Sequence, residues 1–163
     1  MNSKLYKPVL WILLVLYIII LAKFILFKTV IGGVHYNYYI DYHFRIDISN
    51  NLKMANFIPF KSIYHSIFNN DTLEYKLQNI LGNIIGFIPI GFLVPLLFPL
   101  FRSLKLILFI SFFTSLLFET VQLIFVLGTF DVDDLILNSL GGILGYLTLS
   151  AFFRVKKGQR EIG

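Results

Sequence analysis

One acidic residue, Glu119, stands inside a long apolar stretch of the sequence, in the run Phe118-Glu119-Thr120-Val121-Gln122. If this stretch is helical, Gln122 lies one turn away on the same face, where its amide can hydrogen-bond the carboxyl group. An acid at the centre of a membrane helix costs roughly 2.5–3.5 kcal/mol, which makes it a candidate for a functional site. Glu119 can bind a ligand, act as a general base, or be a protonated structural group.

Polar side chains also interrupt two other apolar stretches. Asn79 and Asn83 lie four residues apart, which places both on one face of a helix. Asp134 and Asn138 have the same spacing at the start of a later stretch. With the orientation derived below, all these groups fall in the outer half of the membrane. We therefore predict one outward-facing polar pocket, formed by Asn79, Asn83, Glu119, Gln122, Asp131, Asp133, Asp134 and Asn138.

Structural roles for the same residues stay open. Asn79 and Asn83 can hydrogen-bond across helices and fix their packing without touching a ligand. Asp131 and Asp133 can form a helix cap followed by a solvated loop.

No metal site is predicted. The acidic residues offer hard oxygen ligands for a cation, but their spacing matches no recognised motif. The three histidines, His35, His43 and His65, lack the i, i+4 spacing of a metal-binding pair. The sequence contains no Cys and identifies no cofactor.

The composition indicates the elements that must position these residues. The chain of 163 residues is 57% hydrophobic and only 14% charged, whereas soluble domains carry about 25% charged residues. Four stretches are long enough to cross a bilayer, at residues 8–27, 77–101, 104–127 and 135–153. We therefore predict an all-α polytopic membrane protein with four transmembrane helices and an extracellular segment between the first two.

The basic residues predict the orientation, because they concentrate on the cytoplasmic side of membrane proteins. Lys4 and Lys7 precede the first stretch, Arg102 and Lys105 separate the second from the third, and a basic tail follows the fourth. The connection before the fourth stretch carries Asp131, Asp133 and Asp134 and no basic residue. Both termini are therefore predicted to be cytoplasmic, and because the basic residues flank the spans, the formal charge of +5 does not indicate nucleic-acid binding.

This orientation divides the chain into four parts. Residues 1–27 are a cytoplasmic tip and the first span, 28–76 an extracellular or interfacial segment, 77–153 a core of three spans, and 154–163 a basic cytoplasmic tail. Within the second part, alternating residues at 44–49 predict a short strand that turns at Asn50-Asn51. Ile63, Tyr64, Ile67 and Phe68 have helical spacing and predict a short interfacial helix.

Two glycine pairs lie within the spans. Gly82 and Gly86 in the second, and Gly141 and Gly145 in the fourth, each form a G-x-x-x-G pattern. Such patterns let helix backbones approach closely, so we predict that the second and fourth spans pack through these glycines.

Motifs in three spans resemble those of the VanZ-like family. They are, in order, Asn79-x-x-Gly82-Asn83-x-x-Gly86-Phe87-Ile88-Pro89, Phe118-Glu119-x-x-Gln122, and Asp131-x-Asp133-Asp134-x-x-x-Asn138-x-x-Gly141-Gly142-x-x-Gly145. An upstream element, Asn56-Phe57-Ile58-Pro59-Phe60, matches as well. The resemblance covers about residues 50–153. It implies a small protein of the bacterial cytoplasmic membrane, in a family named for a teicoplanin-resistance protein.

Three functions remain in competition. The first is a membrane protein of the cell envelope that engages membrane lipids, a lipid-linked cell-wall precursor or a lipoglycopeptide. The second is a membrane enzyme acting on an envelope lipid with Glu119 and the acids Asp131, Asp133 and Asp134, although the sequence has no nucleophile elbow or phosphate-binding loop. The third is a small transporter subunit. Whether the chain forms a homo-oligomer stays open.

Overall fold

The structure, a computed structural model, describes residues 3–26, 48–68 and 73–162. This part of the chain is helical apart from short connections and one isolated bridge between two residues. Four helices are long: α1 (Ser3–Leu26), α5 (Leu73–Leu97), α6 (Leu104–Phe125) and α7 (Val132–Ile162). Three are short: α3 (Ile48–Met54), α4 (Lys61–Phe68) and the 3-10 turn η1 (Pro99–Phe101).

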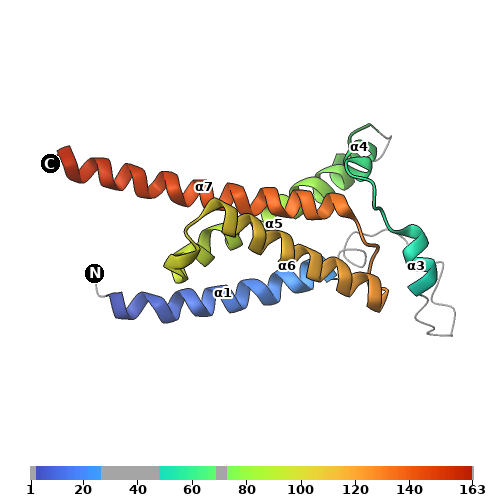
Figure 1. Ribbon diagram of the computed structural model, residues 1–163, viewed down its shortest axis with the longest axis horizontal. Helices are drawn as coiled ribbons and strands as arrows, with labels where there is room; N and C mark the ends of the chain where they lie inside the picture. The colour runs from blue at the N-terminus through green and yellow to red at the C-terminus, as the bar shows by residue number, and fades with distance from the viewer. Residues whose placement is uncertain (1–2, 27–47, 69–72, 163) are drawn as a thin grey trace.

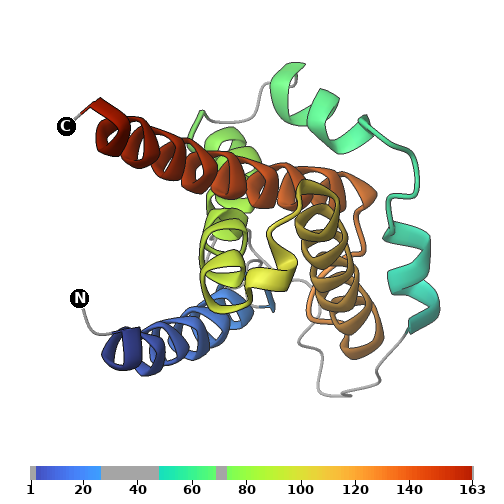
Figure 2. The same ribbon diagram turned by 60° about the vertical axis from the view of Figure 1, so that its left-hand side comes forward.

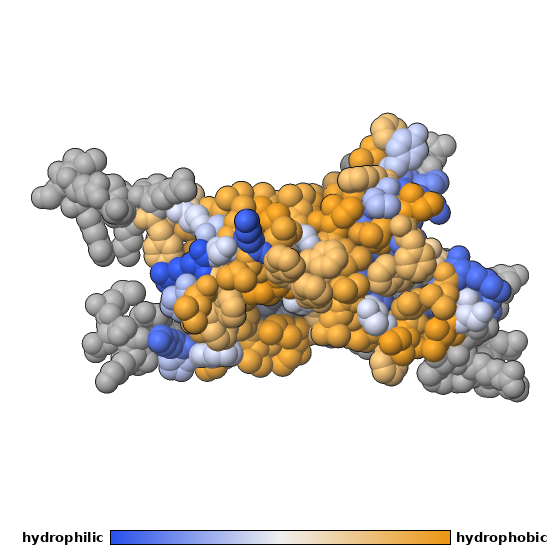
Figure 3. Space-filling view, in the orientation of Figure 1, coloured by the Kyte–Doolittle hydropathy of each residue, from blue (hydrophilic) through white to orange (hydrophobic). Residues whose placement is uncertain are grey.

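Each long helix contains a stretch able to cross a membrane. These stretches are Lys7–Leu26, Asn79–Leu97, Leu104–Phe125 and Val132–Phe153, of 19 to 22 residues, or about 30 Å at 1.5 Å per residue. Large apolar side chains point outward from them, such as Ile20, which is 65% exposed. Figure 3 shows that the surface around the middle of the molecule is mainly hydrophobic. The prediction of a four-span, all-α, multi-pass membrane protein is confirmed.

The four long helices form a bundle in which α5 and α6 lie between α1 and α7 (Figure 1, Figure 2). The contact between α5 and α7 is close because α7 presents glycines to it. A Cβ atom added to Gly141 would lie 2.1 Å from the carbonyl oxygen of Ile84, and one added to Gly145 would lie 2.0 Å from that of Ile88. The two helix backbones therefore touch, as predicted for this pair of glycines.

The other predicted pair, Gly82 and Gly86, has a different neighbour. A Cβ atom at Gly82 would lie 3.6 Å from the ring of Phe24, and one at Gly86 would lie 3.4 Å from Leu21, both on α1. The prediction that this pair packs against the fourth span is wrong. On α5, the glycine that contacts α7 is Gly91. It lies on the same helix face as Ile84 and Ile88, whose carbonyl groups α7 approaches.

The packing of α1 combines apolar contacts with hydrogen bonds. Leu21 and Ile25 form a buried cluster with Phe87 and Ile90 of α5. The Tyr17 hydroxyl donates to the carbonyl oxygen of Gly86 at 2.6 Å. A partly buried hydrogen bond of this kind fixes the rotation of the helix about its axis, which apolar packing within a lipid environment does only weakly.

The two ends of the bundle differ in structure. At one end α1 begins and α7 ends; at the other lie α3, α4 and the connection between α6 and α7, and we call this the α4 end (Figure 1). Residues 154–162 of the predicted tail continue α7 as helix. The short strand predicted up to Ser49 is wrong for residues 48–49, which open α3, and residues 44–47 lie outside the described part.

Candidate functional site

Glu119 is 1% exposed on α6 and faces the connection that leads into α7. Its Oε2 accepts a hydrogen bond from the backbone N–H of Asp131 at 2.9 Å. The carboxyl group therefore fixes the loop immediately before α7. Gln122, one turn further along α6, donates from its amide to the carbonyl oxygen of Ile25 at 2.9 Å. This side chain is buried and ties α6 to α1.

Asp131 pairs with Asn56, a residue far away in the sequence. The two form an isolated parallel bridge, in which Asn56 N donates to Phe130 O at 2.8 Å and Val132 N donates to Asn56 O at 3.0 Å. The Asn56 amide also donates to Asp131 Oδ1 at 2.8 Å. The same oxygen accepts the backbone N–H of Asp133 at 2.9 Å. Asp131 thus joins the segment before α4 to the start of α7.

Asp133 is completely buried, and its carboxylate accepts three backbone hydrogen bonds from the start of α4. Oδ1 accepts from Phe60 N, and Oδ2 accepts from Ser62 N at 2.7 Å and Ile63 N at 3.1 Å. The first N–H groups of a helix have no partner within it, and an anion is favoured there. Asp133 therefore caps a helix, as one alternative held, but that helix is α4 and the residue is not in a solvated loop.

The two asparagines of α5 connect this helix to its neighbours at the α4 end. Asn83, 5% exposed, donates to Asp134 Oδ1 on α7. Asn79 donates to the Ser66 hydroxyl of α4 at 3.1 Å. Together with the bonds of Glu119, Asp131 and Asp133, these contacts join α4, α5, α6 and α7. We call this set the polar network: Asn56, Asn79, Asn83, Glu119, Asp131, Asp133 and Asp134.

Asn138 lies one turn deeper along α7 than Asp134. Its amide donates to the hydroxyl of Ser115 on α6 at 2.8 Å, and both side chains are buried. Within the described residues, Asn138 Oδ1 has no hydrogen-bond partner, and neither has the hydroxyl of Ser111, one turn before Ser115 in α6. Of the predicted pocket residues, Gln122 and Asn138 therefore bond outside the polar network.

A sequence profile of the VanZ/LLP1 family matches residues 14–154. The chain belongs to the VanZ/LLP1 family. Among curated proteins, it is similar to Protein VanZ of Enterococcus faecium, with 32% identity over 133 residues, which make up 82% of this chain and 68% of that protein. No solved structure matches the chain significantly. The matched region includes every residue of the polar network.

The polar network of this VanZ/LLP1 protein contains four acids, Glu119, Asp131, Asp133 and Asp134, yet their geometry is not that of a metal site. Among the residues that the structure describes, no group of three or more His, Cys, Asp and Glu side chains is arranged to hold a metal ion. His65 lies on α4, and His35 and His43 fall outside the described residues. The donors around Asp133 are backbone N–H groups, so its charge is compensated by hydrogen bonds.

Two residues that the sequence did not single out as site residues help to build the α4 end of this VanZ/LLP1 fold. Asn51 is 1% exposed, and its amide donates to the carbonyl oxygens of Gly128 at 2.8 Å and Leu123 at 3.1 Å, beside the end of α6. Asn56, described above, belongs to the Asn-x-Ile-Pro-Phe element. That element could have identified Asn56 as a site residue, whereas no sequence motif indicated Asn51.

Proposed function

We propose that this VanZ/LLP1 protein binds the polar part of a membrane amphiphile at the polar network, on the outer side of the bacterial cytoplasmic membrane. The ligand class comprises a lipid, a lipid-linked cell-wall precursor and a lipoglycopeptide of the teicoplanin type. The observation that carries the proposal is the convergence of three aspartates and a glutamate from α6, α7 and their connection at the end of a lipid-exposed bundle. Acids in such a place are costly, which favours a function for them.

The burial of these side chains divides them into two groups. The buried group is Asn56, Asn83, Glu119 and Asp133, and their hydrogen bonds hold the surrounding backbone and side chains in place. Asp131, Asp134 and Asn79 are only partly buried. Their oxygens can accept hydrogen bonds from hydroxyl, amine or peptide N–H groups of a ligand, while the buried members fix their orientation. A site of this construction is preorganised, which lowers the entropy cost of binding.

The charge distribution supports an outward-facing site. The connection between α6 and α7 contains Asp131 and no basic residue, whereas Arg102 lies between α5 and α6 and Lys105 in the first turn of α6, at the other end. Basic residues mark the cytoplasmic side. A site at the α4 end would then meet ligands of the outer leaflet, where envelope precursors and lipoglycopeptides are found. The four stretches able to cross a membrane agree with a role in the cell envelope.

The test compares wild type with Glu119→Gln and Asp134→Asn by native mass spectrometry of the protein purified from bacterial membranes. Gln keeps an oxygen that can accept the Asp131 N–H bond, so Glu119→Gln removes the ionisable group with little change in packing. We expect both variants to lose co-purified amphiphile, and to lose any effect of the wild type on teicoplanin susceptibility. Thr129→Ala, an exposed position in the same connection, is the control and should behave as wild type.

Two results would contradict the proposal. Full retention of bound amphiphile by both variants would limit the acids to a structural role. Equal loss of amphiphile in the Thr129→Ala control would show that the binding is not specific to the polar network.

A further inference from the structure

The helix α4 is amphipathic in the reverse of the usual sense. Its side toward the protein carries serines: Ser66 is 4% exposed and bonds Asn79, and Ser62 accepts a hydrogen bond from Asn56 at 3.0 Å. Its outward side carries Tyr64, Ile67 and Phe68, which are 61%, 51% and 67% exposed. A helix on a water-soluble protein places its apolar side toward the core. The helix α4 instead directs its apolar side away from the protein.

The turn before α4 adds three more outward apolar side chains: Phe57, Ile58 and Phe60 are each about 60% exposed. Phe60 has a φ of 65°, a left-handed conformation that a bulky residue rarely adopts. Such strain persists only where the surroundings fix the backbone, and here the Asp133 carboxylate holds the Phe60 N–H. The turn is therefore strained, and the described residues leave the ring of Phe60 largely exposed.

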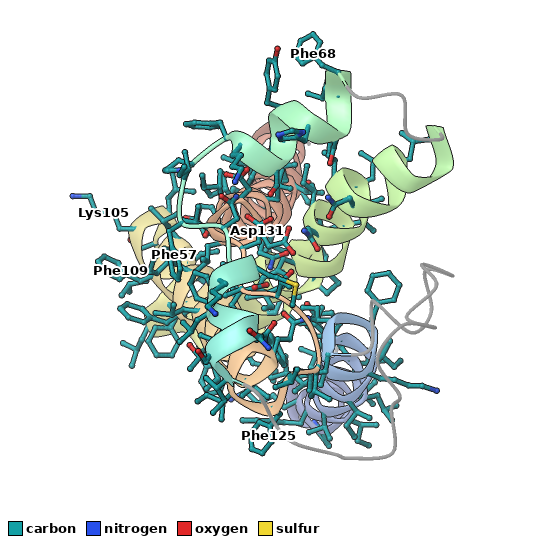
Figure 4. All side chains as sticks on the ribbon, turned by 90° about the vertical axis from the view of Figure 1, so that its right-hand side faces the viewer. Phe57, Phe68, Lys105, Phe109, Phe125 and Asp131 are labelled. Carbon is teal, nitrogen blue, oxygen red and sulfur yellow. The ribbon has the colours of Figure 1, made fainter. Side chains whose placement is uncertain are left out.

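We call these six exposed apolar side chains together the 57–68 face: Phe57, Ile58, Phe60, Tyr64, Ile67 and Phe68. Viewed from the α4 end, Phe68 points away from the bundle while Asp131 lies near its centre (Figure 4). Phe68 is therefore directed away from the polar network. Exposed apolar patches of this kind mark interaction surfaces.

The contacts of α4 determine its level relative to the membrane. Ser66 bonds Asn79, where the apolar stretch of α5 begins, and the start of α4 is capped by Asp133, the second residue of the stretch in α7. The helix therefore lies level with the ends of two spans. At that level the lipid-facing surface of the bundle continues into the 57–68 face. Lys61, at the start of α4, is exposed and can meet lipid phosphates.

We propose that the 57–68 face inserts into the bilayer, at the boundary between headgroups and acyl chains of the leaflet at the α4 end. The helix α4 is then an interfacial helix, attached to the bundle through its polar side and to phospholipid through its apolar side. The aromatic rings Phe57, Tyr64 and Phe68 belong to a class of side chain that favours this level of the membrane. This inference does not depend on the ligand proposed above.

Tryptophan fluorescence tests the insertion directly. The chain has a single tryptophan, Trp11 in α1, so Trp11→Phe provides a background for Tyr64→Trp or Phe68→Trp. Each variant is reconstituted into vesicles of phosphatidylcholine and phosphatidylglycerol, with or without lipids brominated near the headgroup. Iodide is equilibrated on both sides of the membrane, because the protein inserts in both directions. Trp11 in the wild-type protein and N-acetyltryptophanamide in buffer give the lipid and aqueous reference values.

We expect strong quenching of both reporters by brominated lipid, and quenching by iodide several-fold weaker than that of N-acetyltryptophanamide. Iodide quenching equal to the aqueous reference would overturn the inference, because the 57–68 face would then lie in water. Protection from both quenchers would overturn it as well, since a second copy of the chain or another protein would then cover the face. Because each reporter replaces one aromatic residue by another, the two variants provide independent readings on one folded structure.

Discussion

Two buried serines on one face of α6 differ in whether the hydroxyl group has a hydrogen-bond partner. Ser115 accepts the buried amide of Asn138, whereas the Ser111 hydroxyl has no partner among the described residues. Ser115→Ala should lower the free energy of unfolding by about 1 kcal/mol, because it leaves a buried donor unpaired. Ser111→Ala should leave stability unchanged or raise it. Thermal unfolding in detergent measures both, and an equal loss in the two variants would refute the distinction.

At the residue scale, the sequence identified the acids of the network but not what they contact. Glu119 could be found because it is an acid within an apolar run. The bonds from Asp133 to α4 join residues 70 to 73 positions apart, so they arise from tertiary packing and no local pattern contains them. The polar residues around Asn51 in the sequence are typical of an exposed segment. Asn51 is buried only because the end of α6 packs beside it.

Among the helices, the contact between α5 and α7 depends on the absence of side-chain atoms. Gly145→Ala would place a Cβ atom 2.0 Å from the carbonyl oxygen of Ile88, a backbone atom that cannot rotate away. We expect a loss of about 1–3 kcal/mol or of folding yield, as is usual for overpacking. Gly82→Ala is the matched control, since its Cβ would make an ordinary 3.6 Å contact with Phe24. Similar melting temperatures for both variants would show that the helices can separate without cost.

At the element scale, hydropathy predicted the four spans to within a few residues, because a bilayer imposes length and apolarity on each one. The segment between the first two spans was predicted only in part. The spacing of Ile63, Tyr64, Ile67 and Phe68 gave the helix α4, while Ile48, expected in a strand, opens α3. The glycine pattern correctly predicted that Gly141 and Gly145 contact α5. It did not predict that Gly91 is the α5 glycine in this contact, since a G-x-x-x-G pattern does not indicate which helix it packs against.

For the whole molecule, the basic residues predict that the α4 end faces outward. The chain has no Cys, so Ser103→Cys and Thr129→Cys each introduce a single reactive site at opposite ends of the bundle. An impermeant maleimide applied to intact cells should label Thr129→Cys, and should label Ser103→Cys only after lysis. Ser3→Cys should follow Ser103→Cys. Labelling of Ser103→Cys but not of Thr129→Cys would reverse the orientation.

The helix that closes this bundle, α7, is synthesised after the other long helices that the structure describes. α7 leaves the ribosome after α1, α4, α5 and α6, yet it supplies the backbone contact to α5 and, with the residue before it, the carboxylates that hold Asn56 and the start of α4. Until α7 enters the bilayer from the translocon, Asn83 and the glycine-bearing face of α5 lack these partners. The nascent three-helix intermediate therefore displays polar groups to lipid, a feature that membrane quality-control proteases can detect. Defects in α7 are accordingly expected to act first on the amount of protein that cells accumulate.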